Sequence, residues 1–357
     1  MPRPRPRRLL SALSAGLAPH GLDLVTPFRV GPYNAAMEAM PTSSTATSGN
    51  MQLPDLDGRA AGTTLAFLVG NTKALWHPFV RSLRRGGPHE ALLGQPNPLD
   101  QYVERTVRHV LERDLAPLFG DEAGGAGETG GAGETGVAER KGARGRTSSS
   151  MSGRKRPTDA ATGPTTVRFS HRTAPGELIA IQQLCHLSGL AYLSKRSYLC
   201  IHRQHGPWIA LRSVIVFDVS AEEGDVVGIE GGEGTSTTSR GGLKDWEGLN
   251  GLERDDLLAS SDRAQSPHEL PWEGVWGTTA GWDVPCSPSM EAKAEQATAR
   301  AIASGGDPDA WRQWLAVRDV YDAPEWVASR YDDAMLRYHY TYDEEVLHRA
   351  VDAASGS

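Results

Sequence analysis

The chain has 357 residues, a formal net charge of −7 and a hydrophobic content of 39%. This length suffices for one large domain or two ordinary ones, and the 40 glycines and 23 prolines indicate long unstructured insertions. The negative charge argues against a nucleic-acid-binding protein, and no apolar run reaches the roughly 18 residues that a membrane helix needs. Three widely spaced cysteines, Cys185, Cys200 and Cys286, form no CxxC motif and favour a reducing compartment.

Basic residues open the chain, from Met1 to Arg8 in the order MPRPRPRR. Such a start occurs in organelle-targeting peptides, but neither a long apolar core nor a cleavage site follows it. We therefore expect residues 1–15 to form a basic tail and residues 16–355 to form a single domain. The expected location is the cytoplasm, with organelle targeting left open as an alternative.

Three low-complexity stretches are expected to interrupt the domain, at about residues 41–61, 120–165 and 220–307. They are rich in Gly, Ser or Thr, and the second contains a tandem GGAGETG repeat followed by a basic tract. Such composition buries too little apolar surface to offset the entropy of ordering the chain.

The clearest strand is Thr63–Gly70, whose continuous apolar run is typical of a strand that is buried on both faces. The next element is a helix that opens at Asn97, with Pro98 in its first turn. Asn97 suits the capping position, and Asp100 complements the helix dipole.

Further elements follow in the second half of the chain. We expect a helix from Pro175 to about Leu193, and then two antiparallel strands, Ser197–Ile201 and Pro207–Phe217, joined by a turn. Additional helices should begin at Asp307-Pro308 and at Pro324. This order of helices and strands predicts an α+β fold.

Polar residues interrupt the apolar stripe of the expected helix at 175–193. Gln182 and His186 share its apolar face, and Gly189 follows one turn later. Two interpretations remain open. His186 is either a core histidine with satisfied hydrogen bonds beside a glycine that allows close packing, or part of a face that receives a bulky ligand.

Arginine accompanies tryptophan in two separate segments. Arg212 falls on the same face of the second expected strand as Trp208, and Arg318 shares a helical face with Trp311 and Trp314. An arginine in such surroundings binds a carboxylate or phosphate ligand through its planar fork, or else forms a structural ion pair.

No metal site is expected. His202 and His205 lack carboxylate or cysteine ligands at a suitable spacing. The chain also has no P-loop, no GxGxxG after a strand, no GxSxG and no HExxH. The absence of a self-contained catalytic motif favours chemistry carried by a bound cofactor.

Six segments, in the same order, resemble the intracellular cobalamin-processing family of the methylmalonic aciduria and homocystinuria type C protein. This family comprises cyanocobalamin reductases and alkylcobalamin dealkylases. The similar segments are Pro27–Asn34, Thr64–Val69, Asn97–Gln101, Ile179–Leu193, Cys200–Arg212 and Trp311–Asp319. They avoid the three expected insertions. One departure is the run Tyr192-Leu-Ser-Lys195-Arg, where the family has a tyrosine-rich run, and another is the turn with His205 and Pro207.

The resemblance implies a nitroreductase-like α+β sandwich with a central antiparallel sheet and flanking helices. It implies base-off binding of cobalamin and removal of the upper ligand by two reactions. One is reductive decyanation with a reduced flavin, FMN or FAD, fed by NADPH, and the other is dealkylation by glutathione. Expected partners are a downstream B12-trafficking protein and the methionine synthase system, with a homodimer on cofactor binding. Two alternatives stay open: a non-catalytic cobalamin carrier and a generic flavin reductase.

The resemblance also assigns site residues. It implies that glutathione is positioned by Arg212, Arg318 and Arg349. The implied cobalamin-contact positions are Arg168, Ile179, Ala180, Ile181, Gln182, His186, Leu193, Ser194, Lys195, Cys200 and Leu211.

Overall fold

A computed structural model describes residues 5–39, 51–55, 63–119, 165–221, 286–305, 307, 309–321 and 323–356. Within these ranges the chain is a mixture of helices and antiparallel strands. The expected α+β class is therefore confirmed. The nitroreductase-like arrangement and the division into a single domain stay predictions.

The main sheet has four strands in the order β1-β2-β6-β3, and every neighbouring pair is antiparallel. The strands are β1 (Leu24–Arg29), β2 (Thr64–Asn71), β3 (Thr165–Phe169) and β6 (Ala210–Ser220). All eight residues of β2 are buried, which confirms the strand expected from its continuous apolar run. A separate pair joins β4 (Tyr192–Leu193) to β5 (Cys200–Ile201).

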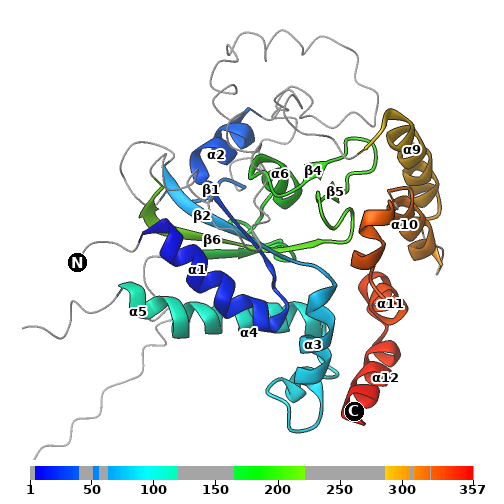
Figure 1. Ribbon diagram of the computed structural model, residues 1–357, viewed down its shortest axis with the longest axis horizontal. Helices are drawn as coiled ribbons and strands as arrows, with labels where there is room; N and C mark the ends of the chain where they lie inside the picture. The colour runs from blue at the N-terminus through cyan, green and yellow to red at the C-terminus, as the bar shows by residue number, and fades with distance from the viewer. Residues whose placement is uncertain are drawn as a thin grey trace, which may run out of the picture.

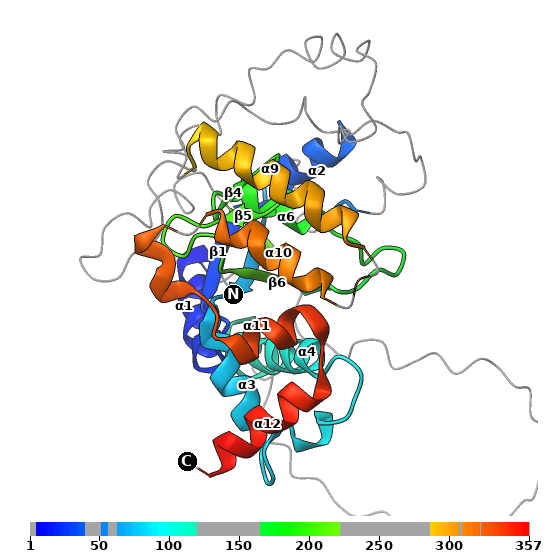
Figure 2. The ribbon, with the colours of Figure 1, turned by 90° about the vertical axis from the view of Figure 1, so that its right-hand side faces the viewer.

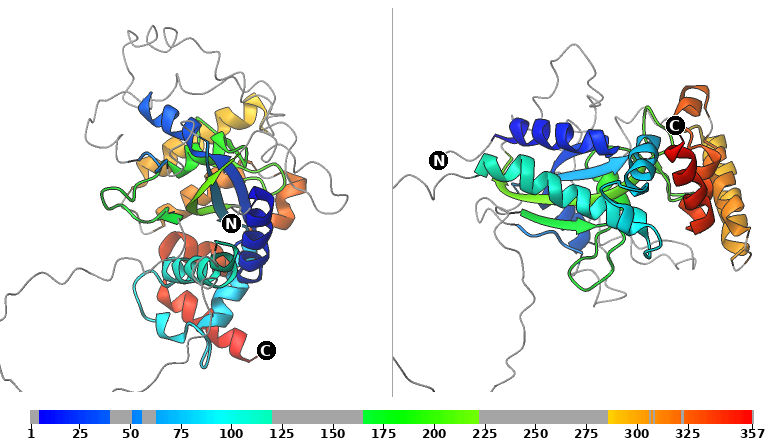
Figure 3. Two further views of the ribbon diagram at one scale, coloured as in Figure 1. Left: turned by 90° about the vertical axis from the view of Figure 1, so that its left-hand side faces the viewer. Right: turned by 90° about the horizontal axis from the view of Figure 1, so that it is seen from below.

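Helices cover both faces of the sheet (Figures 1 and 3). On one face lie α1 (Pro6–Leu17), α4 (Pro98–Val110) and α5 (Ala116–Phe119), with a π-helical turn, Leu111–Leu115, between α4 and α5. On the other face lie α2 (Val30–Glu38) and α6 (Ile181–Leu187). Side chains of β2 alternate between the two resulting cores: Phe67 belongs to the first and Leu68 to the second.

The C-terminal helices stand in a column along one end of the sheet (Figures 1 and 2). They are α9 (Pro288–Ala303), α10 (Ala310–Asp319), α11 (Asp333–Thr341) and α12 (Glu344–Ser355), with a short 3-10 helix at Pro324–Ser329. Helix α12 packs against α3 (Trp76–Leu83), and α10 packs against α9. The expected helix near residue 307 thus begins at Ala310, and Pro308 lies outside the described residues.

The expected basic tail at residues 1–15 is wrong, because most of it forms α1. Leu9, Leu13 and Leu17 lie one turn apart on this helix and are fully buried in the main core. At Gly16, a Cβ atom would lie 2.7 Å from the Cγ1 of Val110 on α4, so the helices meet closely there. The opening basic residues therefore precede and begin an amphipathic helix that covers the sheet.

Two of the expected insertions contain ordered structure. Helix α9 lies within residues 220–307, and Leu53, within 41–61, is buried in the second core. The insertion at 120–165 ends where β3 begins, at Thr165. The other parts of these stretches are almost entirely outside the described residues.

The helix expected from Pro175 to Leu193 is wrong, since α6 spans Ile181–Leu187 alone. Gly189 ends it in a left-handed conformation, with φ of 77°. Its N–H donates to the carbonyl oxygen of His186, and the next N–H, of Leu190, donates to that of Cys185. These bonds complete a helix C-cap of the Schellman type. Gly189 is therefore explained by the reversal of the chain after α6, and not by the approach of a ligand to its backbone.

The expected hairpin between Ser197–Ile201 and Pro207–Phe217 is also wrong. Strand β5 pairs with β4, whereas β6 pairs with β2 and β3. The turn at His202–Gly206 is closed by a bridge between these two residues. Trp208 then lies in the short connection that carries the chain to β6.

No helix among the described residues is long and apolar enough to span a membrane.

The packing of α1 can be tested with Leu13→Ala. Removal of this fully buried side chain should lower the free energy of unfolding by about 2–5 kcal/mol, because a cavity remains in the core. Urea unfolding followed by circular dichroism measures the change. The control Ser11→Ala, at an exposed position of the same helix, should change it by less than about 0.5 kcal/mol. Equal stability of both variants would restore the tail interpretation.

Candidate functional site

The tyrosine and asparagine of the Pro27–Asn34 motif anchor the segment before α6. The Tyr33 hydroxyl accepts a hydrogen bond from the Ala180 N–H at 2.9 Å and donates to the carbonyl oxygen of Met51 at 3.1 Å. Asn34 exchanges two hydrogen bonds with the backbone of Leu53, each at 2.8 Å. Burial raises the pKa of Tyr33 to about 12, so its hydroxyl stays protonated. This motif therefore positions residues that the resemblance assigns to cobalamin.

Several of the assigned positions are partly exposed apolar residues on the same core. Ile179, Ala180 and Ile181 at the start of α6 and Leu211 on β6 all pack on the second core while remaining partly exposed. We call these four residues the apolar wall. A wide apolar ligand edged with polar groups, such as a corrin, suits a wall of this kind.

Gln182 and Cys200 adjoin the apolar wall and contact each other. The Cys200 thiol lies 3.8 Å from the Gln182 carbonyl oxygen, and the Gln182 side-chain amide donates to the carbonyl oxygen of Tyr198 at 2.7 Å. The fold thus brings together two assigned positions that are 18 residues apart.

Ser194 lies in the interior, with no exposed surface. Its hydroxyl donates to Glu291 at 2.8 Å and accepts a hydrogen bond from Tyr321 at 2.9 Å. Leu193 is buried beside it, while Lys195 is exposed. The hydroxyl of Ser194 therefore holds α9 against the turn between β4 and β5, and Lys195 is the neighbour that faces solvent.

Arg168 and His186 both bond to backbone next to the apolar wall. Arg168 donates to the carbonyl oxygens of Leu178 and Met51, at 3.0 and 3.3 Å. The His186 Nδ1 accepts from the Leu193 N–H at 3.4 Å, and burial lowers the pKa of His186 to about 4. A neutral, partly buried histidine with this bond matches the interpretation of a satisfied core residue.

His202 and His205 stack on each other with ring centroids 4.8 Å apart. The His202 Nδ1 accepts the backbone N–H groups of Gln204 and His205, and the His205 Nδ1 bonds to the Ser329 hydroxyl at 2.9 Å. Within the described ranges, no group of three or more His, Cys, Asp and Glu residues is arranged to hold a metal ion. The pair serves to shape the turn.

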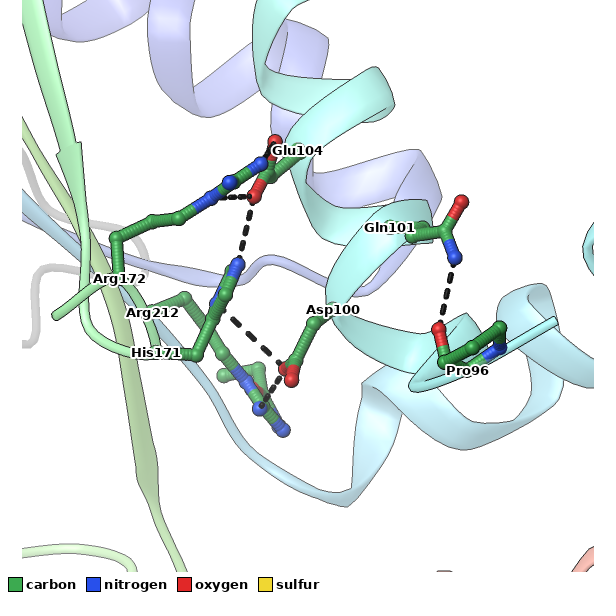
Figure 4. A network of polar contacts seen from close by, with 8 residues as sticks. Pro96, Asp100, Gln101, Glu104, His171, Arg172 and Arg212 are labelled. Atoms are coloured by element: carbon green, nitrogen blue, oxygen red, sulfur yellow. Dashed lines mark hydrogen bonds and ion pairs between the residues drawn. The ribbon is translucent and has the colours of Figure 1, made fainter. Parts of the chain in front are cut away.

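Arg212 projects from β6 toward the first turn of α4 (Figure 4). Its Nε donates to the Asn71 Oδ1 at 2.6 Å, and its Nη1 lies 3.9 Å from the Asp100 Oδ1. Helix α4 begins at Pro98 as expected, but Asn97 has φ of 49° and forms no side-chain cap. Asp100 therefore does more than complement the helix dipole, because it faces a cation from another element.

Glu104, one turn after Asp100, is engaged by other cations (Figure 4). Arg172 bonds to both of its carboxylate oxygens, at 2.7 and 2.8 Å, and His171 lies at 2.7 Å. The hydrogen bonds from Arg172 and His171 outweigh burial and lower the pKa of Glu104. The contact of Arg212 with Asp100, at 3.9 Å, is longer than the contacts of Arg172 with Glu104.

Arg318, on α10, is 8% exposed, and its side chain contacts the segment that precedes β6. Its Nη1 donates to the carbonyl oxygen of Pro207 at 2.8 Å, 111 residues away in the sequence. Its Nη2 lies 3.4 Å from the His339 Nε2, which must accept because a guanidinium only donates. Aromatic rings surround the guanidinium, with centroids 5.7–5.9 Å from its central carbon, on Trp208, Tyr331 and Tyr340.

The expected tryptophan face of α10 does not surround Arg318. Trp314 is 36% exposed and Trp311 is partly exposed with its ring near Arg312 and Tyr340. The ring that contacts Arg318 from the other motif is Trp208. The association of arginine with tryptophan is therefore tertiary rather than helical.

Arg212 and Arg318 meet around His339 and Tyr331. Burial, together with the charges of Arg318 and Arg212, lowers the pKa of His339 to about 3. Burial raises the pKa of Tyr331, while both arginines oppose that rise. We call Trp208, Arg212, Arg318, Tyr331 and His339 the arginine cluster. Near neutral pH it holds two positive charges beside a neutral imidazole, a composition that suits an anionic ligand.

Arg349 lies elsewhere, exposed on α12. Its Nε donates to the carbonyl oxygen of Glu345, one turn earlier in the same helix. The structure thus brings together two of the three arginines that the resemblance assigns to glutathione.

Sequence reasoning missed Tyr331 and His339 as site residues and gave Asp100 a local role. Tyr331 and His339 lie in a tyrosine-rich C-terminal segment that carries no motif of its own. A signal was nevertheless present, since a buried arginine flanked by tryptophan requires acceptors and aromatic faces from other segments.

Comparison with protein-family models and with curated proteins gave no match. Among solved structures, the chain is similar to the B12-trafficking protein CblC of C. elegans, described as a homologue of human MMACHC. The two are 14% identical over 96% of this chain and 95% of that chain, with a TM-score of 0.45.

The low pKa of His339 predicts that acid destabilises the fold. An unfolded chain protonates this histidine at the ordinary pKa of 6.5, whereas the folded chain does so at about 3. Protons therefore favour the unfolded state between these values, and the free energy of unfolding should fall as the pH falls from 6.5 towards 3. Burial of His202 and His186 lowers their pKa values and acts in the same direction.

Urea unfolding measured at several pH values tests this dependence. His339→Gln should flatten the profile, because the variant has no titrating group at this position. Parallel profiles for the wild-type protein and the variant would contradict the prediction.

Proposed function

We propose that this protein processes cobalamin, binding it base-off and removing its upper axial ligand. The observation that carries the proposal is the meeting of Arg212 and Arg318, from two of the six family-like segments, in one buried cluster. Leu211 and Arg212 are consecutive on β6, so the apolar wall and the arginine cluster lie at the same end of the sheet and start from opposite faces of it. An apolar surface for a corrin and a cationic site for a peptide anion at one end of the sheet suit glutathione-dependent dealkylation.

In this reaction the arginines bind and orient glutathione, which carries two carboxylates. Their positive charge also lowers the pKa of the glutathione thiol and so favours the thiolate. The sulfur forms a bond to the alkyl carbon of an alkylcobalamin, and the carbon–cobalt bond breaks with both electrons left on cobalt. The products are an alkyl thioether of glutathione and cob(I)alamin. The protein contributes position and electrostatics.

Decyanation of cyanocobalamin is the second proposed activity, with electrons supplied by a reduced flavin, FMN or FAD, from NADPH. The residues after α6 suit a flavin less well than the tyrosine-rich run that the family has at this place would. The Tyr192 ring lies edge-on to His186, and the residues that face solvent next are Lys195 and Arg196, the latter paired with Glu295. Dealkylation is therefore the reaction that the chain's own residues support better.

The remaining expectations belong to the same proposal. We propose a cytoplasmic protein that passes cobalamin to a downstream trafficking partner and so serves methionine synthase. A homodimer on cofactor binding is part of this proposal.

An absorbance titration separates the candidate functions. The purified protein is titrated with methylcobalamin, and glutathione is then added without oxygen. A base-off spectrum followed by cob(I)alamin and S-methylglutathione supports the enzyme. A base-off spectrum without turnover indicates the carrier, and unchanged spectra would contradict any cobalamin function. Tight binding of FMN without a response to cobalamin indicates a flavin reductase.

Arg212→Gln should reduce kcat/KM for glutathione by about 10- to 100-fold, as expected when a charged hydrogen-bond donor to a ligand is lost. The base-off spectrum should be retained, since the apolar wall is unchanged. The matched control is Arg312→Gln, an exposed arginine on α10 that pairs with Asp309. Equal losses in both variants would indicate a general charge effect.

Arg349→Gln tests the third arginine of the resemblance. Because Arg349 is exposed and bonds within its own helix, the expected change in kcat/KM for glutathione is under about twofold. A loss as large as that of Arg212→Gln would place Arg349 in the glutathione site.

A further inference from the structure

Three donors in the arginine cluster are buried without an acceptor. They are the Trp208 Nε1, the Arg318 Nε and the Tyr331 hydroxyl, and none has a hydrogen-bond partner in the part of the chain that the structure describes. Their residues are 0%, 8% and 2% exposed. A buried donor without an acceptor is destabilising, so such groups in a native fold call for an explanation.

These three donors belong to neighbouring side chains. The Arg318 guanidinium lies over the rings of both Trp208 and Tyr331, at 5.7 and 5.9 Å, and the two rings are themselves 5.7 Å apart. Other buried polar atoms without a hydrogen-bond partner, the Tyr338 hydroxyl among them, lie elsewhere in the described residues. The three donors gathered around one cation instead indicate a shared acceptor that the described part of the chain does not supply.

Charge defines what kind of acceptor fits. The other edge of Arg318 already donates to the Pro207 carbonyl oxygen and to the His339 ring. Arg212 adds a second positive charge, with Asp100 at 3.9 Å. The nearby cation Arg330 is paired with Asp319. Donors with an excess of positive charge and few internal acceptors favour an anion, and a carboxylate offers two oxygens with about four acceptor sites.

We infer that Trp208 and Tyr331 are ligand-binding residues. Together with the Nε edge of Arg318, they bind one carboxylate of glutathione. This inference rests on the proposed function and deepens it. The resemblance assigns arginines alone to glutathione, whereas the structure adds an indole N–H and a phenol hydroxyl. These neutral donors make the site selective for a carboxylate in a fixed position.

Calorimetric titration of the full chain with reduced glutathione tests the inference. Tyr331→Phe removes one hydroxyl and keeps the ring, and it should weaken glutathione binding by about tenfold. The matched control is Tyr338→Phe, on α11, an equally buried tyrosine whose ring packs against Trp76 and Phe79. It should bind within about twofold of the wild-type protein. Glutathione diethyl ester, with both carboxylates blocked, should not bind.

Stability separates a ligand-binding role from a structural one. Without glutathione, Tyr331→Phe should unfold at the same or a higher temperature than the wild-type protein, because the hydroxyl has no internal partner. With saturating glutathione, the wild-type protein should gain more thermal stability than the variant. A variant that is less stable without ligand and binds glutathione normally would overturn the inference.

Further outcomes distinguish this inference from the proposed function. If Tyr331→Phe binds glutathione as tightly as the wild-type protein, the inference is overturned while cobalamin turnover can still support the function. If the protein does not respond to cobalamin but loses glutathione affinity in Tyr331→Phe, the carboxylate site stands and the function fails. Inorganic phosphate that competes as well as glutathione would overturn the choice of a carboxylate.

Discussion

The pairing of β2 with β6 is the contact on which both parts of the site depend. Strand β2 is buried throughout, and its register against β6 sets Asn71 opposite Ala210. From there the Asn71 side chain accepts the Nε of Arg212, 141 residues away in the sequence. The same end of β6 presents Leu211 to the second core. A shift of one residue in this register would exchange the two faces and separate the arginine from its partner.

A second constraint is the placement of buried positive charge. Arg318 is almost fully buried and is stabilised by a carbonyl oxygen, a neutral histidine and three aromatic rings, with no carboxylate in hydrogen-bonding contact among the described residues. Burial of a cation in this way is costly unless its charge is compensated. A bound anion would supply that compensation, which links the energetics of the fold to the proposed binding of glutathione.

The segment from Ile179 to Ile201 is positioned by side chains rather than by long regular elements. Tyr33 holds the residue before α6, and Ser194 joins the turn after β4 to Glu291 on α9. The short elements α6, β4 and β5 could not be stable alone. For this reason the apolar stripe from Ile179 to Leu193 suggested one long helix, although the chain reverses at Gly189.

The sequence by itself determined the features that depend on neighbouring residues. The continuous apolar run identified β2, the position of Pro98 identified the start of α4, and arginines near tryptophans identified Arg212 and Arg318 as candidates. Only the tertiary structure decided that β5 pairs with β4 and that Tyr331 and His339 join the arginines. The physical reason is that local spacing reports periodic burial within one element. Contacts between different elements, near or far in the sequence, depend on how the sheet and the C-terminal helices pack.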